Sequence, residues 1–230
     1  MDVGERYPVK SVSLPIRTLR RVVDICLGFS LLVVSTPIFL LAALAVWIES
    51  EGNPFFIQER IGLGGQPFKM VKLRGMYIDA RSRFPHLYDY AKFGDLNFHF
   101  HYEHDPRITR VGAFIRKTSI DELPNFINVL FGEMTLVGPR PEIPDVLALY
   151  GESKAEYLSV KPGITCLSKI TGRDKLTKGE TIEIDLGYVR NASLRLDRSI
   201  FWQTIKSVIR RQDVFDGVVL DIDSLEQNPD

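Results

Sequence analysis

The most informative stretch of the chain runs from Asp105 to Pro141 and reads DPRITRVGAFIRKTSIDELPNFINVLFGEMTLVGPRP. Two adjacent carboxylates, Asp121 and Glu122, stand in it between basic residues. These are Arg107, Arg110, Arg116 and Lys117 before the pair, and Arg140 in Gly138-Pro139-Arg140-Pro141 after it. Carboxylates can hold a divalent metal or attack phosphorus, and arginines bind phosphate oxygens in a fixed fork. The pattern therefore indicates phosphoryl-transfer chemistry.

The same stretch predicts a helix that begins next to the carboxylates. Ser119, with Glu122 three residues later, has the capping-box spacing. The carboxylates would then lie in the first turn, where the helix dipole stabilises negative charge, and this structural role alone would account for both. The basic surroundings and the Gly138–Pro141 turn favour a functional role. An apolar stripe on the helix, for the core or a membrane interface, consists of Leu123, Phe126, Ile127, Leu130 and Phe131.

Towards the N-terminus, Ile25 to Ile48 is a near-unbroken apolar run of 24 residues. As a helix it would be about 36 Å long, enough to cross a bilayer with some tilt. It starts too late and is too long for a signal peptide, and no small-x-small cleavage site follows it. Ser35-Thr36-Pro37 at its centre predicts a kink, because proline removes a backbone donor. Serine and threonine can hydrogen-bond the carbonyls that this frees.

The charges beside the apolar run indicate its orientation. Arg20 and Arg21 precede it and Glu49 and Glu51 follow it, so the positive-inside rule places the N-terminus in the cytoplasm. A simple span would put the later residues outside, away from cytoplasmic nucleotides. We therefore expect a re-entrant helix-break-helix with both ends on the cytoplasmic face. A buried core helix is disfavoured because the run is apolar all round.

The remaining segments complete a mostly helical α+β fold. Asn53 to Met76 predicts a β-hairpin whose glycines form a turn rather than a phosphate loop. Lys161 to Thr165 indicates another turn. Residues 181–211 predict two helices, the second basic and amphipathic with Trp202, suited to a membrane surface or to core packing. His99, His101 and His104 favour a surface loop over a zinc site.

Composition excludes some classes of protein, and the patterns described above divide the chain into four expected segments. Balanced charge, with 29 basic and 29 acidic residues, gives no field for nucleic acid. Two distant cysteines, Cys26 and Cys166, give no disulfide framework. The expected segments are a flexible N-terminal arm (1–15), a re-entrant membrane anchor (16–50), a catalytic domain (51–215) and an acidic tail (216–230).

From about Arg20 to Arg211 the chain resembles the bacterial sugar transferase family, the monotopic polyprenyl-phosphate phosphoglycosyl transferases. The dense match at 105–141 is supported by FFIQERIGLGGQPFKMVKLRGM, KPGIT, the GR at 172–173 and the LD at 196–197. The resemblance, which is to the minimal form, implies transfer of a sugar phosphate from a nucleotide diphosphate sugar, expected to be a UDP-sugar, to undecaprenyl phosphate with release of UMP. It also implies Mg²⁺, a ping-pong mechanism through an acyl-phosphate, and the first membrane step of polysaccharide or glycoconjugate synthesis.

The resemblance also assigns roles to individual residues. Asp121 would be the nucleophile and Glu122 its metal-binding partner, with both carboxylates near the metal. The residues matching the family's substrate and phosphate site are Lys72, Arg116, Arg140, Arg173 and Asp197. Ser35 and Pro37 match the break of the re-entrant helix, and Arg20 and Arg21 match headgroup-level anchors. Membrane lipids, downstream glycosyl transferases and a second copy of the chain are the implied partners, at the cytoplasmic face of a bacterial inner membrane.

Three departures from the family pattern bear on specificity. Residues 72–76 read KLRGM rather than KFRSM, residues 166–170 read CLSKI without the usual tryptophan, and 80–104 has the character of an insertion. The sugar, the nucleotide and the final polymer are therefore left open. Two other functions compete with the leading one: a catalytically silent membrane scaffold, and an ordinary glycosyl transferase that releases nucleoside diphosphate.

Overall fold

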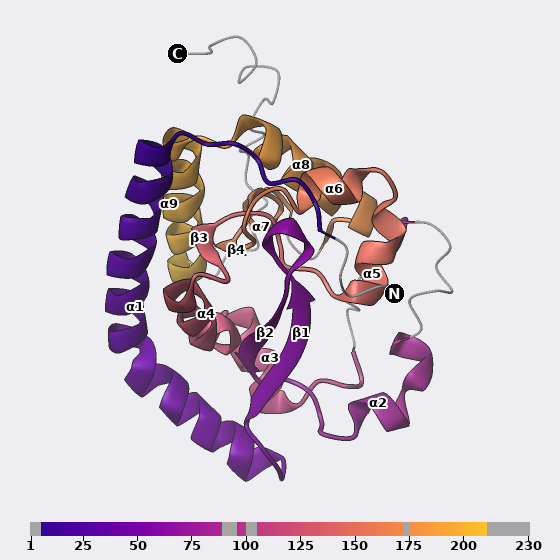
Figure 1. The fold of residues 1–230 in the computed structure, drawn as a ribbon. Coiled ribbons are helices and arrows are strands. Elements are labelled where there is room, and N and C mark those ends of the chain that lie inside the picture. Colours follow the sequence, from indigo (N-terminus) through magenta and orange to yellow (C-terminus); the bar gives the residue numbers. More distant parts are fainter. Residues whose placement is uncertain (1–5, 89–95, 100–104, 173–174, 211–230) are drawn as a thin grey trace.

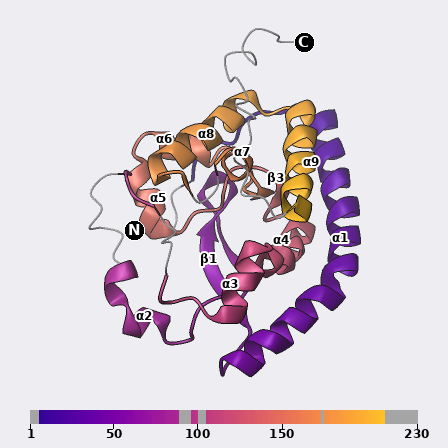
Figure 2. The same cartoon turned by 180° about the vertical axis from the view of Figure 1, so that it is seen from behind.

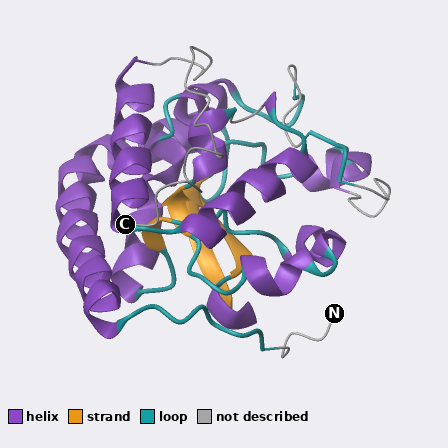
Figure 3. Ribbon diagram, turned by 90° about the horizontal axis from the view of Figure 1, so that it is seen from above, coloured by secondary structure: helices purple, strands orange, loops and turns teal. Residues whose placement is uncertain are grey.

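The structure is a computed structural model that describes residues 6–88, 96–99, 105–172 and 175–210. It is a mostly helical α+β fold, as expected from the sequence, with strands at the centre and helices around them (Figures 1 and 3). The α-helices are α1 (Leu14–Glu49), α2 (Ala80–Arg83), α3 (Arg110–Lys117), α4 (Phe126–Phe131), α5 (Pro144–Leu147), α6 (Ser153–Tyr157), α7 (Leu167–Thr171), α8 (Lys178–Asn191) and α9 (Leu194–Arg210). The strands are β1 (Phe55–Ile61), β2 (Pro67–Leu73), β3 (Thr135–Val137) and β4 (Gly163–Thr165), and 3₁₀ helices span Leu63–Gly65, Pro85–Tyr88, Ile120–Asn125 and Ala148–Tyr150.

The predicted β-hairpin is confirmed. β1 and β2 pair antiparallel from Phe55 opposite Leu73 to Ile61 opposite Pro67. Gly64 and Gly65 have φ of 64° and 84°, which favours glycine in the turn that joins the strands. In β2, Phe68 and Met70 are buried while Pro67 and Lys69 are exposed, so one face of this part of the hairpin packs on the core.

A second, smaller sheet lies where the sequence predicted a turn. β3 and β4 pair in parallel, with Thr135 opposite Gly163 and Val137 opposite Thr165, so the expectation of a turn through Lys161–Thr165 is wrong for its last three residues. The segments that contain β3 and β4 approach closely: the Gly163 N–H donates to Pro139 O at 2.9 Å. A Cβ on Gly163 would lie 2.1 Å from Gly138 N, so only glycine fits there.

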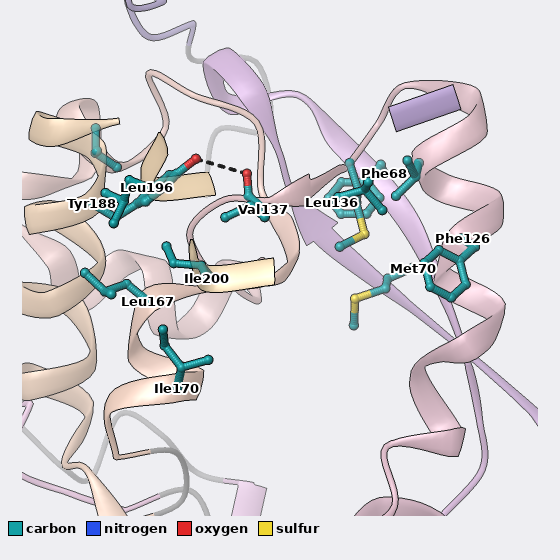
Figure 4. Close-up of a cluster of buried hydrophobic side chains, with 13 residues drawn as sticks. Phe68, Met70, Phe126, Leu136, Val137, Leu167, Ile170, Tyr188, Leu196 and Ile200 are labelled. Atoms are coloured by element: carbon teal, nitrogen blue, oxygen red, sulfur yellow. Dashed lines mark hydrogen bonds between the residues drawn. The ribbon is translucent and has the colours of Figure 1, made fainter. Parts of the chain in front are cut away.

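The main core joins the hairpin, the second sheet and the C-terminal helices. Figure 4 shows Phe68 and Met70 of β2, Leu136 and Val137 of β3, and residues of α4, α7, α8 and α9. Within the core the Tyr188 hydroxyl lies 3.1 Å from Val137 O and 2.7 Å from Asp197 Oδ1, so its one proton is within reach of both acceptors. The short β3 strand is thereby fixed between the central hairpin and α8.

The apolar run forms part of a single helix rather than the expected helix-break-helix. α1 continues for 36 residues with Pro37 inside it, and it bends along its length (Figures 1 and 2). The Thr36 and Ser35 hydroxyls both donate to Leu32 O, at 2.7 and 3.3 Å. The carbonyl that Pro37 leaves without its helical N–H partner is that of Val33, so these two bonds lie one residue before it. α1 therefore bends without separating into two helices, and proline inside a helix is a common cause of such a bend.

One narrow stripe of α1 packs on the protein and the rest is exposed. Of its most apolar window only 22% is buried, and by length and composition this helix could cross a membrane. The buried positions are Asp24, Gly28, Ser35, Phe39, Ala43 and Val46. The exposed apolar surface agrees with the expectation that this is not an ordinary core helix.

Three polar residues near the start of α1 bind the rest of the protein. Arg21 donates to the carbonyls of Val129 and Leu130, both at 2.7 Å, at the C-terminal end of α4. Arg20 pairs with Asp197 at 3.0 Å, where α1 and α9 lie side by side (Figures 1 and 2). The buried Asp24 accepts hydrogen bonds from the Thr135 hydroxyl and from Leu136 N–H. The two arginines expected at headgroup level therefore have protein partners.

The two predicted C-terminal helices are confirmed as α8 and α9. On α9, Leu196 and Ile200 are buried, whereas Trp202 and Ile209 are exposed. Core packing accounts for one face, and the membrane-surface role of the other stays a prediction. The expected acidic tail, 216–230, lies outside the described residues.

The described part of the expected flexible arm has defined contacts. Residues 6–13 run along the rest of the protein, where Tyr7 N–H donates to Gly64 O at 3.1 Å and Lys10 N–H to Ser159 O at 2.8 Å. The Lys10 ammonium donates to Val189 O at 2.6 Å, near the C-terminal end of α8. This segment therefore adds to the packing of the hairpin turn and α8.

Candidate active site

The carboxylate pair lies on the 3₁₀ helix Ile120–Asn125, which links α3 to α4. Ser119 before it has φ 57° and ψ 19°, in the left-handed region, and no capping bond from its side chain is found in the described chain. The predicted capping box is therefore wrong, because the chain turns too sharply between α3 and this helix for Ser119 to face the following N–H groups. A 3₁₀ helix has three residues per turn, so Glu122 and Asn125 stack on one face.

Glu122 is held between two lysines from different elements. Its Oε1 lies 3.0 Å from Lys72 Nζ on β2, and its Oε2 contacts Lys169 Nζ on α7. Burial alone would raise the pKa of Glu122, but Lys169, Lys72 and Arg140 together hold that pKa well below its usual range. Glu122 is therefore a fixed negative charge at neutral pH.

Asp121 lies beside Glu122 in a different electrostatic state. Its carboxylate forms no hydrogen bond or ion pair with the part of the chain that the structure describes. Burial and the charge of Glu122 raise the pKa of Asp121, while Lys72, Lys169 and Arg116 oppose the shift. An aspartate without an internal partner, next to several cations, is available to react.

A pocket opens beside Glu122, and basic side chains from β1, β2, α7 and the loop after β3 surround it. The residues that line it are Arg60, Met70, Lys72, Glu122, Asn125, Met134, Arg140, Pro141, Gly163, Ile164, Cys166 and Lys169. Arg116, in the last turn of α3, lies close enough to Asp121 to influence the Asp121 pKa. The pocket is suited to a ligand with several negative charges.

Behind the pocket, the fully buried Asp185 fixes the two segments that carry its cations. Its Oδ2 accepts from Arg140 N–H at 3.0 Å and its Oδ1 from Ser168 N–H at 3.1 Å. The Tyr157 hydroxyl, 2.9 Å from Arg140 O, also lies beside Asp185. Asp185 therefore sets the positions of Arg140 and of Lys169, the residue after Ser168. Burial raises the pKa of the Cys166 thiol to about 12, so this pocket residue is not a nucleophile at neutral pH.

The structure brings together five of the predicted catalytic and substrate residues. Lys72, Glu122 and Arg140 line one pocket, and Asp121 and Arg116 lie next to it. Asp197 is elsewhere, paired with Arg20 and accepting a hydrogen bond from Tyr188 at 2.7 Å. Its substrate role stays a prediction, and Arg173 lies outside the described residues.

Other basic residues of the opening motif have structural or exposed positions. Arg107 is buried and forms a two-point contact with Asp105, at 2.8 and 2.7 Å. Arg110 and Lys117 are exposed. Among the cations that the motif offers before Asp121, Arg116 is thus the one placed beside the carboxylates.

Three charged or amide residues of the pocket were not predicted from the sequence: Arg60, Asn125 and Lys169. Lys169 falls in CLSKI, a segment with no phosphate-type spacing, and reaches Glu122 because α7 follows β4. Arg60 lies on β1 and donates to Pro141 O at 2.9 Å. Arg60 and Lys169 reach the pocket only because segments distant in sequence pair. Asn125 is three residues after Glu122, so its position next to the carboxylates was a signal for its place in the site.

The donor set for a metal is small but suited to magnesium. No group of three or more His, Cys, Asp or Glu side chains converges anywhere in the described ranges. Mg²⁺ commonly uses one or two carboxylates together with substrate phosphate and water, so Asp121 and Glu122 fit such a site. His99 Nδ1 lies 3.2 Å from Leu176 O, and His101 and His104 lie outside the described residues.

Together the fold and site define a class of protein: an α+β domain with a carboxylate pair in a basic pocket, attached to one long apolar helix. Residues 16–211 match the family model for bacterial sugar transferases. The chain belongs to the bacterial sugar transferase family.

Several relatives have informative names. The chain is 35% identical over 204 residues to an undecaprenyl-phosphate galactose phosphotransferase of Salmonella typhimurium, covering 86% of this chain and 42% of that protein. It is 37% identical over 209 residues to an undecaprenyl-phosphate glucose phosphotransferase of Komagataeibacter xylinus, covering 85% of this chain and 37% of that protein. It is 35% identical over 209 residues to the exopolysaccharide production protein ExoY of Sinorhizobium fredii, covering 90% of each. The chain spans about two fifths of the length of the first curated relatives it matches.

Proposed function

We propose that this protein transfers a sugar 1-phosphate from a nucleotide diphosphate sugar, a UDP-sugar in the first instance, to undecaprenyl phosphate. The observation that carries the proposal is Asp121, a carboxylate without a partner in the described chain, beside a pocket of lysines and arginines. The names of the relatives support a polyprenyl-phosphate acceptor and a role in exopolysaccharide synthesis.

The proposed chemistry has two displacements at one phosphorus. An Asp121 oxygen attacks the phosphorus that bears the sugar, and the bond from that phosphorus to the bridging oxygen breaks, so that UMP leaves. An oxygen of the polyprenyl phosphate then attacks the same phosphorus, and the acyl-phosphate bond to Asp121 breaks. Two displacements regenerate the carboxylate and require a ping-pong order.

The cations of the pocket make the diphosphate a better electrophile. Arg140 and Arg116 can bind phosphate oxygens bidentately, and Lys72 and Lys169 supply compact charges. Glu122 and Asp121 would hold the magnesium ion, which when bound neutralises charge on the diphosphate. In the structure both Glu122 oxygens contact lysines, so a bound metal ion would have to compete with Lys72 and Lys169 for them.

The membrane arrangement belongs to the same proposal. A polyprenyl phosphate presents its charged group at the bilayer surface, so the pocket should lie at headgroup depth on the cytoplasmic face of a bacterial inner membrane. We propose that α1 enters and leaves the bilayer on this face, with its bend at Ser35–Pro37. Its exposed apolar surface and that of α9 would contact lipid.

Two competing functions make different predictions. A catalytically silent scaffold has no need of an Asp121 without a partner or of the surrounding cations. An ordinary glycosyl transferase would cleave the sugar–oxygen bond and release nucleoside diphosphate. The identity of the released nucleotide therefore separates the three functions.

The test is a panel of UDP-sugars with undecaprenyl phosphate and the full chain in nanodiscs. We expect UMP release that depends on both substrates and a product that retains the sugar and its phosphate, identified by mass spectrometry. Release of UDP would instead support the glycosyl transferase. No turnover with any nucleotide sugar, by folded protein, would support the scaffold.

Magnesium dependence gives a further prediction. EDTA should stop the reaction, and added Mg²⁺ should restore it. Glu122→Gln removes a charged oxygen ligand but preserves shape, so it should raise the Mg²⁺ concentration for half-maximal activity or abolish turnover. An unchanged magnesium titration in the Gln variant would refute the metal role of Glu122.

A further inference from the structure

A buried amide next to the carboxylate pair has an atom without a hydrogen-bond partner. Asn125 is 2% exposed, and its Oδ1 is buried with no partner in the described chain. Asparagine before a helix often caps it, but Asn125 has helical angles, φ −63° and ψ −16°, and makes no capping bond there. Because an unpaired buried polar atom is costly, folding alone does not account for this residue.

Asn128, one helical turn away, has the hydrogen-bond partners expected of a buried asparagine with a structural role. It is also 2% exposed, yet its Nδ2 donates to Lys69 O at 2.8 Å and to Glu133 Oε2 at 2.7 Å. Its Oδ1 lies 3.4 Å from Val71 N, which donates to it. The two residues share type, burial and neighbourhood, so the missing partner at Asn125 is not a general property of this region.

Asn125 also lines the pocket. It stands one 3₁₀ turn after Glu122 on the same face, and Met70, Met134 and Ile164 form an apolar wall of the same pocket. The charged side chains of the pocket match a diphosphate and a metal ion. Among the described residues that line it, Asn125 is the amide and offers both a strong hydrogen-bond acceptor and donors, whereas the Cys166 thiol is only a weak donor and acceptor and contacts the Ser168 hydroxyl.

We propose that Asn125 is a specificity-determining residue whose amide hydrogen-bonds a neutral donor–acceptor group of the bound nucleotide sugar. A sugar hydroxyl and the imide edge of the base both offer this chemistry. The proposal rests on the proposed function, because it places a nucleotide sugar in this pocket. Buried amides discriminate strongly, since a ligand without the matching group leaves the amide unpaired.

The test combines protein variants with donor analogues. kcat/KM for UMP release is measured for wild type and Asn125→Leu with the parent donor, with a series of deoxy-sugar donors, and with a donor methylated at N3 of uracil. Asn125→Leu preserves size and removes the hydrogen bond. We expect about a 10-fold loss for the variant on the parent donor, the usual effect of one hydrogen bond.

The decisive result is coupling between the variant and one analogue. Wild type should lose activity on the analogue that lacks the partner group, and Asn125→Leu should treat that analogue and the parent donor alike. Coupling to a deoxy sugar identifies the sugar as the source of the partner group, and coupling to N3-methyluracil identifies the base. Equal kcat/KM for wild type and variant on every donor, or a uniform loss on all of them, overturns the proposal.

Stability measurements separate this role from a structural one. Asn125→Leu removes an unpaired buried polar atom, so its Tm should equal or exceed that of wild type. The matched variant Asn128→Leu leaves Lys69 O and Val71 N–H without their partner and should lower Tm. An equal fall in both variants overturns the proposal. Wild type that releases no UMP contradicts the proposed function itself, whereas active wild type without coupling contradicts only the role of Asn125.

Discussion

At the scale of single residues, Asp121 carries the sharpest prediction. Asp121→Asn should reduce turnover by more than about 10³-fold, because the amide is not a nucleophile and the loss of a nucleophile removes the whole pathway. The side chain keeps its shape, so Tm should change little. Wild type incubated with labelled UDP-sugar and no lipid should acquire label on Asp121. Substantial turnover by the Asn variant would remove Asp121 from the mechanism.

Lys169 leads to a prediction about pH. It lowers the pKa of both Asp121 and Glu122, so Lys169→Met should raise both. In wild type the Glu122 ion pairs stabilise the fold above its unfolded pKa, about 4.5, and this stabilisation is lost as pH falls through the lower folded value. Activity requires the ionised carboxylates, and their pKa values rise when Lys169 is removed. The acid limb of the kcat/KM profile should therefore begin at higher pH in the variant, and its midpoint reports the combined titration of Asp121 and Glu122.

Lys69→Met is the control for this experiment, since Lys69 lies on the same strand as Lys72 but is exposed. Its acid limb should coincide with that of wild type. If Lys169→Met also leaves the acid limb in place, Lys169 does not set the charge of the carboxylate pair.

At the scale of elements, the β3–β4 pair determines the pocket geometry through its glycines. A Cβ on Gly163 would lie 2.1 Å from Gly138 N, so Gly163→Ala must separate the strands and move the segment that carries Arg140. We expect a destabilisation of about 3 kcal/mol by denaturant unfolding, at the upper end for overpacking, together with loss of activity.

Gly187→Ala is the matched control, because nothing lies within 4 Å of a Cβ at that position of α8. It should leave stability unchanged or slightly increased, since alanine favours a helix more than glycine does. Equal stability of Gly163→Ala and wild type would show that the close contact of the two strands is unimportant.

The bend in α1 gives a prediction about topology. With Cys26 and Cys166 replaced by alanine, single cysteines before residue 18 and after residue 50 should both be shielded from an impermeant thiol reagent in intact cells. Replacing Ser35, Thr36 and Pro37 with leucine or alanine should straighten the helix, and one end should then become accessible. Opposite accessibility of the two ends in the otherwise unchanged chain would rule out re-entry.

Local patterns were sufficient to predict several elements and part of the site. The alternation of Phe68 and Met70, the glycine turn after β1 and the helical periodicity of α9 are properties of neighbouring residues. The parallel pairing of β3 with β4 joins segments 28 residues apart and rests on close glycine contacts, so no local pattern reveals it. The carboxylates and Arg140 could be found from sequence, whereas Lys169 depended on that long-range pairing.

At the scale of the whole molecule, hydrogen bonds and an ion pair connect α1 to the segments that form the pocket. Asp24 of α1 binds Thr135 and Leu136 of β3, and β3 leads directly into the segment that carries Arg140. Arg20 connects the same helix to Asp197, whose other partner is Tyr188, and Tyr188 binds Val137. If α1 lies in a bilayer as proposed, its depth would therefore set the depth of the basic residues of the pocket.

This attachment has a practical consequence for obtaining the protein in pure form. Cutting off α1 to make a water-soluble fragment would remove the acceptor for Leu136 N–H and the guanidinium that binds the Val129 and Leu130 carbonyls. It would also uncover Leu73 and Ile115, which pack against Phe39, Ala43 and Val46 of α1. Such a fragment would expose new apolar surface and aggregate, so biochemical work requires the intact chain in detergent or a lipid disc from extraction onward.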